Sequence, residues 1–113
     1  MYGISLDERG GNRVTVNGEF ASVAEFLTEF VTDVSSEGVF IRTDTPLPEG
    51  KELNLKFTII GNDIEIIEGE GTVVRSIPAG NGAQAGMGVE FKRLTRESRQ
   101  AIERVVEARK RLS

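Results

Sequence analysis

The sequence predicts a mainly β fold, a six-stranded antiparallel β-barrel followed by a C-terminal α-helix. Three observations predict it. Several short runs alternate apolar and polar residues with the period of two that half-buried strands show. Glycine, at 13 of 113 residues, exceeds the usual ~7%, and turn signals separate the runs at intervals of about 8–12 residues. The last 20 residues contain neither glycine nor proline and repeat their apolar positions every three or four residues, as a helix does.

Three strands are expected in the first half of the chain. The first starts at Val14, the second covers residues 26–34 and the third covers residues 39–42. Each follows a period of two, although Leu27 and Val31 blur the pattern of the second. These runs therefore predict strands with one buried and one exposed face.

Three further strands are expected in the second half. Residues 53–60 alternate most clearly, and the next strand begins at Ile64 after a turn. Its pattern slips in phase at Ile67, beside two glycines, which predicts a bulge or sharp bend. Residues 86–91 form the last strand. Three large apolar residues are expected in the core rather than on a base-stacking surface: Phe40, Leu47 and Phe91.

The helix is expected over residues 95–112, with Thr95 as its N-cap. The positions that repeat on one face of this helix are Ile102, Val105, Val106, Arg109 and Leu112. Residues 94–113 carry six basic and three acidic side chains, whereas the whole chain has a net charge of −4. We expect a surface helix that packs on the barrel. The alternative is a basic tail that docks on a partner or a lipid surface.

The chain is expected to form a single domain, residues 1–113, with a flexible N-terminal loop (1–13), a barrel (14–93) and a helix (95–112). No run approaches the ~20 apolar residues of a membrane-spanning helix. The first residues lack the basic and apolar regions of a signal peptide, so the expected compartment is the cytoplasm. The acidic net charge argues against a DNA or RNA partner.

Composition also excludes several kinds of chemistry. The chain has no cysteine and no histidine, which excludes disulfides, thiol nucleophiles, Cys/His zinc sites and Ser-His couples. Glu65, Glu68 and Glu70 are interpreted as a solvated strand face, because no base or nucleophile accompanies them. We therefore expect no catalytic residues, no metal site and no cofactor, and a protein that is not an enzyme.

Two segments carry residues suited to an anionic, base-containing ligand. Arg9 and Arg13 flank a Gly-Gly-Asn bend, and their guanidinium groups can bind phosphate or the O6/N7 edge of guanine. Asp33, Ser35 and Gly38 lie in a strand connection and offer a carboxylate acceptor, a hydroxyl donor and open backbone. Each segment alone also has an ordinary interpretation, solvated charges for the first and a turn for the second.

In this order, Arg-x-x-x-Arg followed by Asp-x-Ser-x-x-Gly, the two segments resemble those of the PilZ domain family. The likeness covers residues 9–106 and continues through 46–50, 69–75 and the final Gly-Met-Gly-Val-Glu-Phe strand. It is strongest to single-domain PilZ paralogues of the myxobacterial type. The resemblance implies a six-stranded barrel with a C-terminal helix and binding of the bacterial second messenger cyclic di-GMP.

The resemblance also implies a role for each matching residue. Arg9 and Arg13 would grip phosphates and the guanine Hoogsteen edge, Asp33 and Ser35 would contact the guanine, and Gly38 would let the base approach the backbone. The expected function is a cyclic di-GMP receptor that signals to an unidentified protein partner of a motility or exopolysaccharide system. The alternative is a PilZ-fold adaptor that does not bind the nucleotide, because acidic residues precede Arg9 and two glycines follow it.

Overall fold

The computed structural model describes residues 3–7, 13–27, 31–61, 63–80, 82 and 84–112. Its sheet has seven strands in the order β1-β2-β5-β6-β7-β4-β3. The helices and strands follow along the chain as β1 Gly3–Asp7, β2 Val14–Phe20, α1 Val23–Glu25, β3 Val31–Val34, β4 Gly38–Arg42, β5 Glu52–Ile60, β6 Ile64–Ile77, β7 Gly86–Leu94 and α2 Arg96–Leu112. The mainly β fold with a C-terminal helix is thus confirmed. Five of the predicted strands are present as β2 and β4–β7, and the sixth is present only in its last part as β3.

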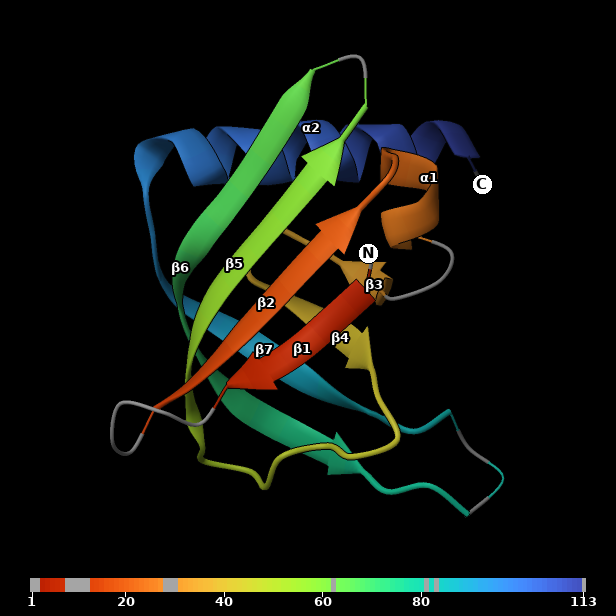
Figure 1. The fold of residues 1–113 in the computed structure, drawn as a ribbon, viewed down its shortest axis with the longest axis vertical. Helices are drawn as coiled ribbons and strands as arrows, with labels where there is room; N and C mark the ends of the chain where they lie inside the picture. The colour runs from red at the N-terminus through yellow and green to blue at the C-terminus, as the bar shows by residue number, and fades with distance from the viewer. Residues whose placement is uncertain are drawn as a thin grey trace.

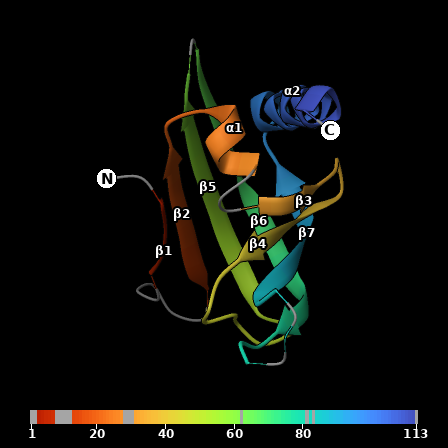
Figure 2. The same cartoon turned by 90° about the vertical axis from the view of Figure 1, so that its right-hand side faces the viewer.

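The sheet curls into a half-barrel (Figures 1 and 2). Strands β1, β2 and β5 form one side and β7, β4 and β3 the other, while α2 lies across one end. Within the described residues, β1 and β3 are the two edge strands, so the predicted barrel takes the form of a half-barrel. This shape leaves a broad outer surface on both sides of the curl.

Two details of the predicted barrel are wrong. Strand β2 runs parallel to β5, with Val14 beside Leu53 and Phe20 beside Ile59, whereas the prediction was entirely antiparallel. Alternation along a strand shows which face is buried but contains no information about the direction of its neighbour. In addition, β1 lies inside the segment 1–13 that was expected to be a flexible loop, and it pairs antiparallel with β2.

The predicted strand over residues 26–34 is correct only at its end. The chain first makes the short helix α1, and Phe26 and Leu27 are buried in the helical turn that follows it. Ser22 caps α1 by accepting a hydrogen bond from the backbone N–H of Glu25 (3.1 Å), and Glu25 accepts one from the N–H of Ala21 (2.6 Å). This Ser-x-x-Glu pattern resembles a capping box and is the signal that the strand interpretation missed.

The core lies inside the curl. Strand β5 alternates between exposed and buried residues along its whole length, as predicted. Three aromatic rings meet at the centre, with Phe20 4.7 Å from Phe26 in an edge-on arrangement and Phe57 5.6 Å from Phe26. The predicted core residues Leu47 and Phe91 are half-buried and pack against the hydrophobic core. Burial of these apolar side chains is the main force that holds the sheet in its curl.

The phase slip predicted at Ile67 is wrong, because β6 pairs with β5 in unbroken register from Ile64 to Thr72, and Ile67 and Val73 are buried on the same face. The irregularity predicted beside the glycines is present in the pairing of β6 with β7. The register shifts between Glu70 and Gly71 and again between Val73 and Arg75. Ile67 and Val73 are fully buried, whereas Ile66 and Val74 are exposed. Bulges bend a strand and increase its twist, which a curled sheet requires at its corners.

Helix α2 is anchored to β6 at its first turn. The backbone N–H of Ser98 donates to the Thr95 hydroxyl (3.0 Å), so the predicted N-cap is confirmed. The buried hydroxyl of Ser98 accepts a hydrogen bond from the N–H of Glu68 (2.7 Å). Ala101, Ile102 and Val105 are also buried against the sheet, which confirms the packed helix.

Farther along α2, an exposed ion pair joins the helix to the same strand. Arg104 donates to both carboxylate oxygens of Glu65 on β6. Hydrogen bonding to Glu65 is the main reason that the pKa of Arg104 is raised above its ordinary value. The helix is thereby held along the β5–β6 hairpin.

Candidate functional site

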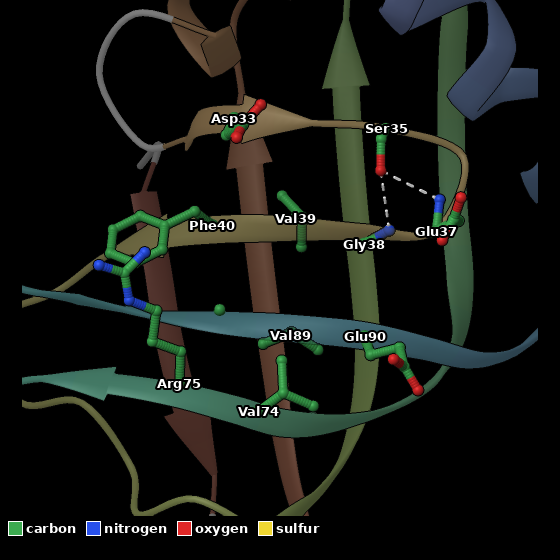
Figure 3. Close-up of a pocket in the computed structure, with 11 residues that line it drawn as sticks. Asp33, Ser35, Glu37, Gly38, Val39, Phe40, Val74, Arg75, Val89 and Glu90 are labelled. Atoms are coloured by element: carbon green, nitrogen blue, oxygen red, sulfur yellow. Dashed lines mark hydrogen bonds between the residues drawn. The ribbon is translucent and has the colours of Figure 1, made fainter.

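An open cavity of about 340 Å³ lies on the outer surface of the sheet (Figure 3). Its volume falls within the range of ~300–1,000 Å³ that small-molecule sites occupy. The described residues that line it come from β3, β4, β6, β7 and the β3–β4 connection: Asp33, Ser35, Glu37, Gly38, Val39, Phe40, Val74, Arg75, Gly88, Val89 and Glu90. Below, this cavity is called the outer pocket.

The structure brings Asp33, Ser35 and Gly38 together in the outer pocket. The Ser35 hydroxyl accepts hydrogen bonds from the backbone N–H groups of Glu37 (3.1 Å) and Gly38 (3.3 Å). The Ser35 N–H in turn donates to the Gly38 carbonyl (2.9 Å), which closes the turn. Ser35 therefore braces the strand connection, while its own hydroxyl proton stays available for donation to a ligand.

Gly38 is required by packing between strands. A side chain there would place its Cβ 2.5 Å from the carbonyl oxygen of Val89 on the neighbouring strand β7. A positive φ is not the reason for glycine here, because the described residues with positive φ are Gly50, Gly80 and Gly82. Glycine at this position lets β4 approach β7 closely and also keeps the pocket wall free of side-chain atoms.

Arg13 lies away from the outer pocket. Its guanidinium donates to Asn54 Oδ1 (3.1 Å) and Glu52 Oε2 (2.9 Å), and it lies 3.5 Å from Glu70 Oε1. Glu52 pairs with Thr72 of β6, which in turn pairs with Glu90 of β7, a residue that lines the outer pocket. At about 4.8 Å per strand, two strand spacings separate Glu52 from Glu90 by roughly 10 Å. Arg9 lies outside the described residues.

Phe40 and Arg75 are two of the pocket residues that the sequence did not predict as site residues. The prediction that Phe40 is a core residue is wrong, because its half-buried ring lies on the outer face of β4 and lines the pocket. The ring covers Gly86, where an added Cβ would lie 2.6 Å from a ring carbon. A glycine on the neighbouring strand was the available signal, since the bare backbone leaves room for a large side chain beside it.

The charge around the outer pocket is mainly negative. Asp33, Glu37 and Glu90 contribute carboxylates, and Arg75 contributes the one basic side chain among the described lining residues. Lys92 partly offsets this charge, because its ammonium group lies 2.5 Å from Glu90 Oε1. A ligand with hydrogen-bond donors on one edge and anionic groups elsewhere would find partners for both here.

A second cavity, of about 480 Å³, lies between the β3–β4 connection and α2. Its lining residues are Val34, Ser35, Ser36, Glu103, Val106 and Glu107. Ser35 lines both cavities, so the outer pocket and the surface of α2 meet at this residue.

Comparison with protein families identifies the kind of domain to which the chain belongs. The PilZ domain family model matches residues 8–108. The chain belongs to the PilZ domain family. Membership indicates a binding module of the cyclic di-GMP type rather than a catalytic domain. No curated protein matches the chain.

Two properties of this PilZ domain bear on what it could bind. Within the described part of the chain, no group of three acidic side chains is arranged to hold a metal ion. The helices described here are also too short or too polar to cross a membrane. The outer pocket, which has Asp33, Ser35 and Gly38 on its wall, is the candidate site.

Proposed function

We propose that this protein is a receptor for cyclic di-GMP, which binds with one guanine in the outer pocket. The observation that carries the proposal is that Asp33 and Ser35, the acceptor and donor of the PilZ motif, line one open cavity with an aromatic ring. A cyclic dinucleotide has two bases and two phosphates, so a cavity of about 340 Å³ suits one half of it. The other half then lies over the sheet surface.

Each pocket group has a complementary group on guanine. The Asp33 carboxylate accepts hydrogen bonds from the N1–H and N2–H₂ edge, which adenine lacks. The Ser35 hydroxyl, already oriented by Glu37 and Gly38, donates its proton to the ligand. The Phe40 ring offers a face for base stacking, which contributes about 1–3 kcal/mol per base in nucleic-acid sites.

Arg9 and Arg13 act on the bound ligand from the N-terminal side. In this proposal the segment 9–13 lies over the ligand, and its two guanidinium groups bind phosphate or the guanine O6/N7 edge. Arg13 leaves Glu52, Asn54 and Glu70 in the process. Ligand binding therefore exchanges an internal ion pair for a contact with the ligand.

We further propose that the bound state signals to a protein partner in a motility or exopolysaccharide system. The position of Ser35 supports a route, because this residue lines both the outer pocket and the cavity beside α2. A ligand that contacts Ser35 acts on the β3–β4 connection, which forms one wall of that second cavity. The surface offered by α2 and this connection then differs between the free and bound states.

Isothermal titration calorimetry tests the receptor function. We expect heat of binding with cyclic di-GMP at low salt, much weaker binding with cyclic di-AMP, and loss of binding in the double variant Arg9→Ala/Arg13→Ala. Circular dichroism serves to show that the variant remains folded. Absence of heat with the intact protein at about 100 μM would contradict the proposal, since affinities weaker than this range produce little complex.

The second candidate function is an adaptor that keeps the fold and does not bind the nucleotide. Two observations favour it: three carboxylates line the pocket, and Arg13 is engaged by acidic side chains elsewhere. An adaptor would capture its protein partner equally well with and without cyclic di-GMP. A receptor would show nucleotide-dependent capture, so the two functions differ in one pull-down experiment.

A further inference from the structure

Arg75 is the described cation that already faces the outer pocket. Its guanidinium makes no hydrogen bond or ion pair with any described residue. Arg13, in contrast, is held by Glu52, Asn54 and Glu70 on another part of the sheet. The pocket therefore has one cation in place while Arg13 is bound to other side chains.

A bulge in β6 explains why Arg75 faces outward. Val73 pairs with Val89 of β7, but the next paired residue is Arg75, opposite Gly88, so Val74 is an extra residue. Val73 is buried and Val74 is exposed. In a regular strand Arg75 would return to the buried face, two residues after Val73. The bulge instead directs Arg75 to the outer face, and bulges commonly re-aim side chains in this way beside binding sites.

The surroundings of Arg75 suit a ligand with a flat base and an anionic group. Figure 3 shows the side chains of Arg75 and Phe40 in the same part of the pocket. Gly88 lies beneath them, and a Cβ there would come within 3.3 Å of Arg75 Cβ and 3.9 Å of the Phe40 ring. The missing side chain at Gly88 thus keeps the space between the two groups open.

Charge gives the reason that an anionic ligand needs Arg75. The described wall carries three carboxylates, Asp33, Glu37 and Glu90, which repel phosphate at short range. A guanidinium in the wall offsets that repulsion and can bind a phosphate through two parallel hydrogen bonds. Lysine supplies the same charge without this fork, so the two residues are not equivalent in such a site.

We propose that Arg75 binds a phosphate of the cyclic dinucleotide and is a third arginine of the site, beside Arg9 and Arg13. The inference rests on the proposed receptor function. Arg75 contacts the ligand from the floor of the site, whereas the N-terminal arginines approach from outside. Its charge is therefore needed even when the N-terminal segment is intact.

Calorimetry with cyclic di-GMP at several salt concentrations tests the role of Arg75. We expect Arg75→Ala to bind at least tenfold more weakly than the intact protein and to show a shallower dependence of affinity on salt, because one phosphate contact is lost. Arg75→Lys should recover part of the affinity. Arg99→Ala, which removes an exposed arginine from α2, is the matched control and should bind like the intact protein.

The possible failures are distinguishable. If the intact protein binds and Arg75→Ala binds within about twofold of it with an unchanged salt dependence, the role of Arg75 is refuted and the receptor function stands. If the intact protein gives no binding, both are refuted. Thermal unfolding of each variant monitors folding, and the partial recovery by lysine separates a charge effect from a packing effect.

Discussion

Arg13 and Glu52 form an ion pair that holds a motif arginine away from the pocket it is expected to serve. The Arg13 Nη1 group donates to Glu52 Oε2 at 2.9 Å, and Glu70 lies 3.5 Å from the same guanidinium. Both carboxylates are well exposed, so the pair is weakly stabilising and can exchange for a stronger partner. A phosphate of cyclic di-GMP is such a partner in the proposed function.

The first prediction concerns this ion pair. Glu52→Gln weakens the ion pair that holds Arg13. The affinity for cyclic di-GMP should therefore rise by about two- to fivefold, which corresponds to the free energy of an exposed ion pair. Calorimetry at low salt measures the change. Glu97→Gln removes an equal charge from the first turn of α2 and should have no such effect. An unchanged affinity for Glu52→Gln would show that the ion pair does not compete with the ligand.

The second prediction separates base recognition from phosphate attraction. Asp33→Ala removes the carboxylate proposed to accept hydrogen bonds from the guanine edge. The variant should lose preference for cyclic di-GMP over cyclic di-AMP, because both ligands have the same phosphates. Competition between the two nucleotides measures the preference directly. If selectivity is retained, Asp33 is a residue of the strand connection and does not recognise the guanine base.

The third prediction concerns communication between the two cavities. On addition of cyclic di-GMP, the amide NMR signals of Ser36 and Val106 should shift, because Ser35 lies between the outer pocket and this region. The amide chemical shift of Ile64, at the exposed tip of the β5–β6 hairpin, should not change and serves as the internal control. Shifts confined to the outer pocket would leave the proposed signalling route without support.

The fourth prediction tests how α2 is joined to the sheet. Ser98→Ala removes the hydroxyl that accepts the Glu68 N–H, and leaves that partly buried donor without this partner. The variant should lose about 1–3 kcal/mol of unfolding free energy. Ser36→Ala, at an exposed position, should change stability little. Denaturant unfolding of both variants would falsify the assignment if they lost equal amounts.

The fifth prediction tests which side chains of β6 face the core. Ile67 is fully buried, whereas its neighbour Ile66 is 41% exposed. Ile67→Ala should therefore cost about 2–5 kcal/mol of unfolding free energy, as large-to-small core substitutions do. Ile66→Ala should cost much less, because its side chain already contacts solvent. Similar losses for the two variants would mean that the strand is rotated relative to this structure.

The amino-acid sequence by itself determined the fold class, the places of β2 and β4–β7, the C-terminal helix and its cap, and the family. These features depend on local patterns: alternation in β5, the stripe on α2, the Thr95 cap and the order of the motif residues. Such patterns are visible in the chain because each follows from which face a residue buries or which backbone group it satisfies. The Ser22–Glu25 pattern was also visible and was overlooked.

Only the tertiary structure decided the rest of the site. The parallel pairing of β2 with β5, the engagement of Arg13 by Glu52 and the Val89 carbonyl that requires Gly38 all join residues that are distant in the sequence. Arg75 is the clearest case, because strand alternation alone would have placed it in the core. One extra residue in β6 reverses its direction, and the need for that bulge arises from pairing with β7. Contacts between strands thus selected which charged side chains face the pocket, and no pattern within a single strand contains that information.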